Sequence, residues 1–565
     1  MKKWLVNDNT ASAQELSKQL KLPLITTKLL INRGIIDPRQ MEIFLNPKLS
    51  GLRDPYEIPD IEKAARRVLL AKERGEKVIV YGDYDVDGIT GTAILVHTLR
   101  YLGIEAKYYI PHRYNEGYGL SEEAIKNIAQ EGINLIITVD CGVANREEIG
   151  IANSLGLEVI VTDHHNLPDQ LPEALAIVNP KQLPANHPSR QLSGAGVAFK
   201  FAWAILRTAG IKESGFLISL LDLAALGTLS DMVPLTGENR IIAVGGLGLI
   251  NERKRSGIKM LTEAASLKGK ITENQVYFGL APRINAAGRL EHAARSVELF
   301  LSDDPDRTRE IARELSRINS RRQDIGASIK EEIFSLLSPG DHEEKKIIIL
   351  SGNDWHPGVI GIVASQIVDV FNRPAILIGI NEGVGRGSAR SLEGINVFEL
   401  LYPCRDLFID FGGHAGAAGF EISPEDIEEL EKRLLREAEK RITSEELSPK
   451  IDIDAEIIPS NITLGLVEEL ECLAPFGEGN PAPLFMMRGL SLVDLKRVGA
   501  EGKHLKMWWE KEGTKLEVIG FGLGKKRDQL DPDKKYDIVF NLGRREYNGF
   551  ESVQLTLVEY REESQ

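Results

Sequence analysis

Several short runs of β-branched residues in the first half of the chain are each followed at once by side chains that bind metal ions. Asp83 follows the run that ends at Val80, Asp140 directly follows Val139, and Asp163 follows the run that ends at Val161. Amphipathic stretches over residues 90–102, 121–131 and 146–155 separate the runs, an order that predicts an α/β domain with a mostly parallel sheet. Because the carboxyl ends of parallel strands open into one crevice, the polar side chains are expected to gather there.

The first acidic group consists of Asp83, Asp85 and Asp87, which occupy alternate positions. In an extended segment alternate side chains point the same way, so all three carboxylates are expected to converge. A calcium-binding loop would require Glu at its twelfth position, which is Ile94 here. Capping of the following helix accounts for one acid but not for three. The pattern therefore favours a site for divalent cations.

The other two strand ends complete the expected metal site. Asp140 is expected to bridge two ions and His164 to supply a nitrogen ligand, a set that suits Mn²⁺ or Mg²⁺. Two such ions can activate a water molecule for attack on a phosphodiester. His165 is then expected to face the substrate, while Asp163 orients an imidazole ring.

One further acid is expected near the end of the next helical pattern. Asp231 lies between an apolar helix and Pro234, whereas Asp222 lies within the helix, so Asp231 is the candidate ligand. The alternative is that Asp231 is a plain residue of a helix C-terminal turn.

The chain of 565 residues is too long for one core, because single cores stop growing at about 250 to 300 residues. A helix of about 30 residues and about 45 Å is expected from Pro305 to Leu337, before Pro339 and Gly340 end it. Beyond residue 449, short strands with glycine turns predict a small OB-type β-barrel. The expected domains are an irregular N-terminal cap (1–60), a parallel-sheet catalytic domain (61–240), a helical connector (241–340), a second α/β domain (341–448) and the barrel (449–565).

Composition limits where this protein works and what it binds. The chain has no apolar run of the roughly 18 residues that span a bilayer and no secretory signal, so a cytoplasmic protein without membrane contact is expected. Three widely spaced cysteines favour neither a disulfide framework nor a zinc site. A net charge of −14 excludes a uniformly basic surface, so a phosphate-rich substrate needs a local basic track.

The arginines of the long helix could line such a track or could form a solvated face paired with Glu310 and Glu314.

Four segments together resemble the motifs of the DHH phosphoesterase superfamily. They are YGDYDVDG (81–88), VDCG (139–142), DHH (163–165) and GTLSD (227–231). The run GGHAGAAG (412–419) looks like the glycine-rich signature of the associated DHHA1 substrate-binding domain. APRINAAGR (281–289), WHPGVIG (355–361) and APFGEGNP (474–481) are similar to segments of the RecJ family of single-strand-specific 5′-to-3′ DNA exonucleases.

The resemblance implies a metal-ligand set. Its members are Asp83, Asp85, Asp87, Asp140, His164 and Asp231. The superfamily often has a His four positions before the first ligand Asp, and that position is Tyr81 here. Asp85 and Asp87 therefore match the two ligand aspartates of the superfamily's first motif, and Asp83 is the candidate substitute for the missing imidazole.

The resemblance also implies how DNA is held. Arg113, Ser388 and Arg390 are expected to bind a terminal 5′-phosphate, and guanidinium groups suit phosphate oxygens. The resemblance also implies substrate contacts from Asn285, Arg289, Gly412 and Gly413. It implies four catalytic residues, of which His165, His414 and Arg283 stabilise charge at the phosphorus and Asp140 acts through the ions. In the barrel, Trp508 and Trp509 must point to opposite faces of a strand, so one is expected to be buried and the other available for base stacking.

The metal-site pattern predicts a two-metal hydrolase, and the resemblance implies an exonuclease that degrades single-stranded DNA from its 5′ end to mononucleotides in DNA repair and recombination. The expected cofactors are two Mn²⁺ or Mg²⁺ ions, and the expected form is a monomer that works with a single-strand-binding protein and a helicase. One alternative is a DHH enzyme for small substrates such as short oligoribonucleotides, although the segment after residue 451 argues against it. Another is a non-catalytic DNA-binding relative, which would be expected to lack metal ligands.

Overall fold

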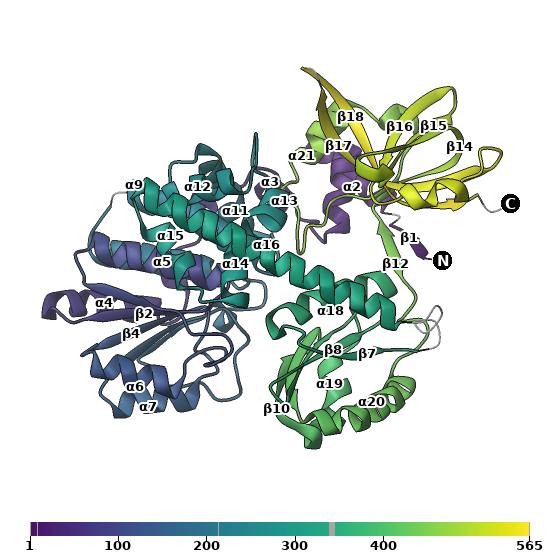
Figure 1. The fold of residues 1–565 in the computed structure, drawn as a ribbon. Coiled ribbons are helices and arrows are strands. Elements are labelled where there is room, and N and C mark those ends of the chain that lie inside the picture. The colour runs from purple at the N-terminus through teal and green to yellow at the C-terminus, as the bar shows by residue number, and fades with distance from the viewer. Residues whose placement is uncertain (1, 8, 213, 338–344, 548, 564–565) are drawn as a thin grey trace.

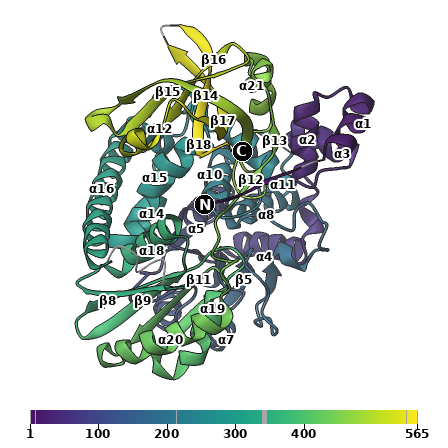
Figure 2. The ribbon, with the colours of Figure 1, turned by 90° about the vertical axis from the view of Figure 1, so that its right-hand side faces the viewer.

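The computed structural model describes residues 2–7, 9–212, 214–337, 345–547 and 549–563. Figure 1 shows a catalytic lobe, a second α/β lobe and a C-terminal barrel, with one long helix crossing between the lobes. In the view of Figure 2 the barrel lies above the helical layer, and the second lobe lies below it. No helix within the described ranges has both the length and the apolar character needed to cross a bilayer.

The catalytic lobe is built on a parallel sheet of order β3-β2-β4-β5-β6. Its strands are β2 (Val78–Gly82), β3 (Ala106–Tyr109), β4 (Leu135–Val139), β5 (Glu158–Thr162) and β6 (Ala176–Val178). One face packs on α4 (Ile61–Arg74), α5 (Val86–Tyr101) and α8 (Gly194–Thr208), and the other on α6 (Glu122–Gln130) and α7 (Arg146–Ser154). The prediction of a parallel α/β domain is confirmed.

A helical layer follows the sheet. It comprises α9 (Ser214–Ser219), α10 (Leu221–Ser230), α11 (Gly237–Glu252), α12 (Ser256–Ala264), α13 (Glu273–Gln275), the π-helix η4 (Val276–Leu280), α14 (Ala281–Leu290), α15 (Ala294–Leu301) and α16 (Pro305–Leu336). The Asp304 side chain caps α16 by accepting from the backbone N–H groups of Asp306 and Arg307. With 32 residues, α16 spans about 48 Å, as expected from the sequence.

The second lobe contains a mixed sheet of order β10-β11-β9-β8-β7, in which only β7 and β8 are parallel. Its strands are β7 (Ile348–Asn353), β8 (Ala375–Asn381), β9 (Val384–Arg390), β10 (Phe408–His414) and β11 (Ala417–Ile422), and its helices are α18 (Pro357–Phe371), α19 (Val397–Leu401) and α20 (Ile427–Arg441). The domain boundary expected at residues 340 and 341 falls outside the described residues.

The C-terminal strands close into a barrel, because β14 pairs with both β15 and β17. The barrel strands are β14 (Phe485–Val498), β15 (His504–Lys511), β16 (Thr514–Gly520), β17 (Lys535–Tyr547) and β18 (Phe550–Glu562), preceded by β12 (Lys450–Ile453), β13 (Ala455–Glu456) and α21 (Leu464–Glu471). Trp509 is fully buried, whereas Trp508 is half-buried, and the ammonium groups of Lys496 and Lys506 lie 5.1 and 5.2 Å from its ring centroid. The predicted barrel and the opposite burial of the two tryptophans are confirmed.

The N-terminal segment is not irregular, and that prediction is wrong. It forms β1 (Lys3–Val6), α1 (Thr10–Leu20), α2 (Leu24–Asn32) and α3 (Pro38–Leu45). The prolines that suggested irregular structure start helices instead: Asp37 caps α3 and Pro38 occupies its first turn. Leu29, Met41 and Phe44 then pack into the same hydrophobic core as the barrel strands, far away in sequence.

Candidate active site

The first acidic group lies where β2 passes into α5. Asp85 is the N-cap of α5, and its Oδ1 accepts hydrogen bonds from the N–H groups of Asp87 (2.9 Å) and Gly88 (3.1 Å). Asp87 already lies in the first turn of α5, where it accepts from the N–H groups of Gly194 and Ala195 at the start of α8. The carboxylates therefore converge through a strand-to-helix turn and not through an extended segment.

Three ligand atoms meet opposite this turn. Nε2 of His164 lies 3.0 Å from Oδ1 of Asp140 and 3.6 Å from Oδ2 of Asp231. Asp140 follows β4 in a left-handed backbone conformation (φ 61°), and Asp231 is the C-cap of α10. Asp222 instead binds Arg255 within the helical layer. The choice of Asp231 over Asp222 therefore agrees with where the two carboxylates lie.

The side chains form three overlapping groups whose ligand atoms lie within 4.8 Å of one another. They are Asp83 with Asp85 and Asp140, Asp87 with His164 and Asp231, and Asp140 with His164 and His165. Asp140 and His164 each belong to two of the groups, and of the two only the carboxylate of Asp140 has two oxygens with which to contact two ions. Tyr81, at the position where the superfamily often has His, is buried and donates to the carbonyl of Gly119. A carboxylate oxygen of Asp83 lies within 4.8 Å of oxygens of Asp85 and Asp140.

The charges of this cluster are not balanced by the protein. Burial raises the pKa of Asp83, Asp87 and Asp140 well above the usual aspartate value, and the neighbouring carboxylates raise it further. Oδ1 of Asp83 and Oδ2 of Asp231 are buried without a hydrogen-bond partner among the described residues. Burial also lowers the pKa of His164, which favours the neutral imidazole that binds metals. Orphaned carboxylate oxygens beside a neutral imidazole fit a divalent cation.

His165 differs from His164 because it has a carboxylate partner. Its Nδ1 lies 2.8 Å from Oδ1 of Asp163, which also accepts from the backbone N–H groups of both histidines. Burial opposes the charge of His165, but the bond to Asp163 and the nearby acids raise its pKa to about 9. Asp163 thus orients the ring, as expected, and His165 is suited to donate to a phosphoryl oxygen.

Tyr118 is a site residue that the sequence analysis missed. Its hydroxyl donates to the backbone carbonyl of Asp140 (2.8 Å) and lies 3.0 Å from Nδ1 of His165. It comes from a loop after β3, and no local pattern distinguishes it from other tyrosines. Only the folded chain brings it to the cluster.

These residues line a cleft of about 410 Å³, which we call the acidic cleft. Arg113, Asn285 and Arg289 line the same cleft on another side. Burial and the positive charge of Arg113 lower the pKa of Arg289, to about 10, and that of Arg390. Guanidinium groups whose charged form is disfavoured in this way favour a bound anion.

Arg390 and Ser388 lie on β9, and a guanidinium N–H of Arg390 donates to Oγ of Ser388 (3.0 Å). A Cβ atom at Gly361 of α18 would lie 2.8 Å from the Arg390 guanidinium and 2.9 Å from the Ser388 hydroxyl. Glycine at this position therefore lets α18 pack closely against these two side chains of β9. Arg113, Ser388 and Arg390 come from both lobes, as a pocket between the lobes requires.

Gly412, Gly413 and His414 lie at the exposed end of β10. In the sheet register His414 opposes Ala417 on β11, which in turn opposes Arg390 on β9. His414 thus shares a sheet face with Arg390, about 10 Å away across two strand spacings of about 4.8 Å. The structure does not bring His414, Gly412 or Gly413 to the walls of the acidic cleft.

Arg283 also lies away from the metal cluster. Its guanidinium donates to Oγ of Ser316 on α16 (3.1 Å) and to the carbonyl of Gly279. The structure does not place it beside the phosphorus position expected from the sequence, because its guanidinium is turned toward α16 and does not line the acidic cleft.

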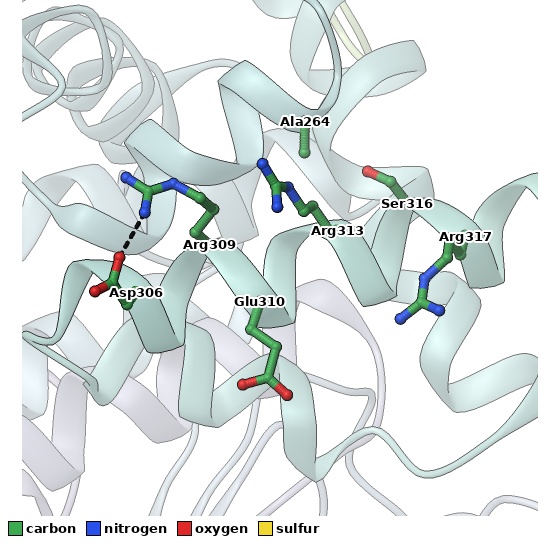
Figure 3. Close-up of a pocket in the computed structure, with 7 residues that line it drawn as sticks. All are labelled: Ala264, Asp306, Arg309, Glu310, Arg313, Ser316 and Arg317. Carbon is green, nitrogen blue, oxygen red and sulfur yellow. Dashed lines mark hydrogen bonds and ion pairs between the residues drawn. The ribbon is translucent and has the colours of Figure 1, made fainter.

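A second hollow of about 730 Å³ lies along α16, and we call it the arginine groove. Its residues include Ala264, Arg309, Arg313, Ser316 and Arg317. In Figure 3, Arg309 and Arg313 rise from α16 on the side of Ala264, while Glu310 points away. Arg309 binds Asp306 (2.6 Å), whereas Arg313 and Arg317 have no hydrogen bond or ion pair with any described residue. Part of the helix is therefore a paired, solvated face, including the ion pair of Arg307 with Glu310, and the phosphate track stays a prediction.

Three family descriptions match parts of this chain. The DHH family, N-terminal domain, matches residues 77–228, the DHHA1 domain matches residues 344–440, and the RecJ OB domain matches residues 453–559. These segments contain the parallel sheet, most of the second lobe and most of the barrel.

Related proteins match nearly the whole chain. A Bacillus subtilis protein named single-stranded-DNA-specific exonuclease RecJ is 38% identical over 547 residues, which cover 96% of this chain and 69% of the relative. The Escherichia coli protein of the same name is 33% identical over 565 residues, with 95% and 96% covered. The crystal structure of RecJ from Thermus thermophilus in complex with Mn²⁺ has a TM-score of 0.86 and 31% identity, covering 100% of this chain and 80% of that one. A Mg²⁺ complex from the same organism gives a TM-score of 0.80.

Proposed function

The chain belongs to the RecJ family, and we propose that it is a Mn²⁺- or Mg²⁺-dependent exonuclease that degrades single-stranded DNA from the 5′ end to mononucleotides. One observation carries this proposal. A cluster of buried carboxylates with a neutral imidazole shares its cleft with Arg113 and Arg289, whose charges call for an anion. A strand end suits both groups of residues: its first phosphodiester would lie at the ions held by the carboxylates, and its terminal phosphate would lie at the arginines.

The proposed roles follow from the distances within the cleft. Asp83, Asp85 and Asp140 would hold one ion, and Asp87, His164 and Asp231 would hold the other. Oδ1 of Asp140 lies 3.0 Å from Nε2 of His164, so Asp140 would also be near the second ion. A pair of bound ions supplies a polarised water and neutralises charge on the phosphate. His165, held by Asp163, donates to a phosphoryl oxygen and stabilises the charge that develops there.

The 5′-to-3′ direction of degradation is proposed to follow from the pocket between the lobes. Arg113, Ser388 and Arg390 hold the terminal 5′-phosphate, and Arg289 and Asn285 contact the first nucleotide from the wall that they share with a smaller adjoining cavity. The end of the strand is then fixed relative to the metal ligands. The enzyme would cut one nucleotide from that end in each cycle and shift the strand forward.

Selection of single strands is proposed to depend on width. The path of the strand between the two lobes is proposed to be too narrow for a duplex. The arginine groove extends this path along α16, where Arg313 and Arg317 provide free guanidinium groups. Successive arginines four residues apart on a helix are about 6 Å apart along its axis, so the groove can follow successive phosphates of an extended strand.

Two residues receive adjusted roles in this proposal. Because Arg283 binds Ser316, it is proposed to contact the strand where it passes α16 and not the phosphorus that is attacked. His414, with the backbone of Gly412 and Gly413, is proposed to reach the phosphate next to the cut when the two lobes close on DNA. The proposal also retains a monomeric cytoplasmic enzyme in DNA repair and recombination, aided by a single-strand-binding protein and a helicase.

The test uses long strands and duplexes labelled at either end, together with a dinucleotide, each with Mn²⁺, Mg²⁺ or chelator. We expect a 5′ label to be released at once as a mononucleotide, a 3′-labelled strand to shorten gradually, and a blunt duplex to resist. Asp140→Ala should be inactive on every substrate, whereas Asp533→Ala, at an exposed turn of the barrel, should match the wild type. Release of the 3′ label first, or faster cleavage of the dinucleotide than of the long strand, would contradict the proposal.

A further inference from the structure

Residues 472–481, which we call the docking segment, connect α21 to the first barrel strand and accept five hydrogen bonds from the catalytic half of the chain. The central contact is Arg240 of α11, which is 2% exposed. Its guanidinium donates to the carbonyls of Leu473 (2.8 Å), Cys472 (3.1 Å) and Ala474 (3.1 Å). A buried cation that binds three successive carbonyls fixes the path of this segment against α11.

The next part of the docking segment lies on the loop that follows Asp231. The backbone N–H of Leu235, four residues after Asp231, donates to the carbonyl of Glu478 (2.8 Å). Gly479 has φ +67°, and a Cβ atom there would lie 3.0 Å from Pro234. The loop that begins at a metal ligand is therefore held from outside by the backbone of another domain.

The docking segment also holds Tyr277 in the π-helix η4. The Tyr277 hydroxyl donates to the carbonyl of Phe476 (2.8 Å). A Cβ atom at Gly477 would collide with that hydroxyl and would lie 2.9 Å from Leu235. Tyr277 lines the smaller cavity that shares Ser230 and Asn285 with the acidic cleft. Gly477 therefore packs against both Tyr277, which lines this cavity, and Leu235, which follows Asp231.

The docking segment is stiff enough to act as a support. Gly477 and Asn480 exchange two backbone hydrogen bonds, of 2.9 and 3.1 Å. The Asn480 side chain is fully buried and donates to the carbonyls of Leu473 (2.8 Å) and Pro475 (2.9 Å), and Nε of Arg33 donates to its Oδ1 (2.7 Å). These bonds close the segment on itself, so a displacement of one end would be transmitted to the other.

We infer that the docking segment is a positioning element of the catalytic site: it sets the place of Asp231 through Leu235 and of the adjoining cleft wall through Tyr277. This inference rests on the proposed function, because it assigns the segment to the metal-ligand loop. Its residues touch neither the ions nor the phosphorus. They act on the reaction through the backbone that carries Asp231.

One consequence concerns the barrel. Leu466 and Leu470 of α21, and Leu473 in the docking segment itself, pack in the barrel core, so the barrel anchors one end of the segment. Deleting the barrel would remove a DNA-binding surface and a support of the metal site together. Substitutions in the full chain are therefore the informative experiment.

Gly477→Ala is the main variant, and Gly465→Ala is its control, because a Cβ atom at Gly465 in α21 would meet only Oγ1 of Thr463 at 3.7 Å. Mn²⁺ binding is measured by calorimetry without DNA, and kcat and KM are measured on a short 5′-phosphorylated strand. We expect Gly477→Ala to weaken Mn²⁺ binding and to lower kcat by about tenfold, as for other residues that support metal ligands, with little change in KM. Adding Tyr277→Phe should recover part of the loss, because it removes the hydroxyl with which the new methyl group collides.

Equal Mn²⁺ affinity and kcat in Gly477→Ala and Gly465→Ala, with both proteins folded by circular dichroism, would overturn the inference. If Gly477→Ala does not fold, Tyr277→Phe alone decides: a lower Mn²⁺ affinity supports the inference, and wild-type affinity overturns it. Because calorimetry needs no cleavage, a wild type that binds Mn²⁺ but leaves single strands intact would count against the proposed function alone.

Discussion

Nε2 of His164 lies 3.0 Å from Oδ1 of Asp140, and the two residues follow neighbouring strands of one parallel sheet. Burial lowers the pKa of His164, so its ring is neutral near pH 7, while burial and neighbouring acids raise the pKa of Asp140. A divalent cation bound by both side chains would stabilise this arrangement, because it would accept the imidazole lone pair and balance the carboxylate charge.

Mn²⁺ should stabilise the folded protein. The cluster of carboxylates opposes folding when all are ionised, and a cation that binds only the folded state adds about 2.7 kcal/mol at a concentration of 100 times Kd. We expect a melting temperature several degrees higher with Mn²⁺ than with chelator, measured by scanning calorimetry. Asp140→Asn should lose most of this increase, and Asp533→Asn should keep it; an equal increase in both variants would contradict the metal assignment.

Asp140→Ala should separate chemistry from DNA binding. We expect kcat to fall by about 1000-fold or more, as when a main stabiliser of the transition state is lost. The affinity for a long single strand should change by no more than about threefold, since phosphate contacts elsewhere supply most of it. Gel-shift titration and a single-turnover cleavage assay measure the two quantities, and surviving turnover would refute the bridging role of Asp140.

Arg390→Ala should reduce the preference for 5′-phosphorylated ends. Losing one charge-assisted bond to phosphate costs about 1.5 to 3 kcal/mol, so kcat/KM on phosphorylated strands should fall about tenfold or more. Strands with a 5′-hydroxyl should be cut at nearly the wild-type rate. Arg405→Ala is the control, because Arg405 is exposed and stacks on Tyr402 in the same lobe; equal losses on both kinds of end would argue against the pocket.

The double substitution Arg313→Gln and Arg317→Gln should weaken binding of long strands through phosphate contacts. Each lost contact should lower the slope of log affinity against log salt by about 0.7, or about 1.4 for the pair. Arg309→Gln should have a smaller effect, because its guanidinium already binds Asp306. Fluorescence anisotropy at several salt concentrations measures these slopes, and an unchanged slope in the double variant would exclude DNA from the arginine groove.

Several features could be predicted from the sequence because local patterns encode them. Acids directly after short apolar runs indicate the carboxyl edge of a parallel sheet, which is where Asp140 and His164 lie. Alternation along a strand required one of Trp508 and Trp509 to be buried. The cap at Asp304 and the following proline fixed the start of the long helix.

Other features depend on contacts between segments that are far apart in the chain, and no local pattern encodes these. Arg113 and Arg390 come from different lobes, and Tyr118 reaches Asp140 from a loop. The N-terminal helices pack in the same hydrophobic cluster as the barrel strands, because apolar side chains from both ends of the chain leave water together. The sequence alone therefore determined which acids and histidines follow the strand ends and made them the candidate metal ligands. The tertiary structure decided which arginines face the acidic cleft and which backbone holds the loop of Asp231, because these depend on how separately folded segments pack.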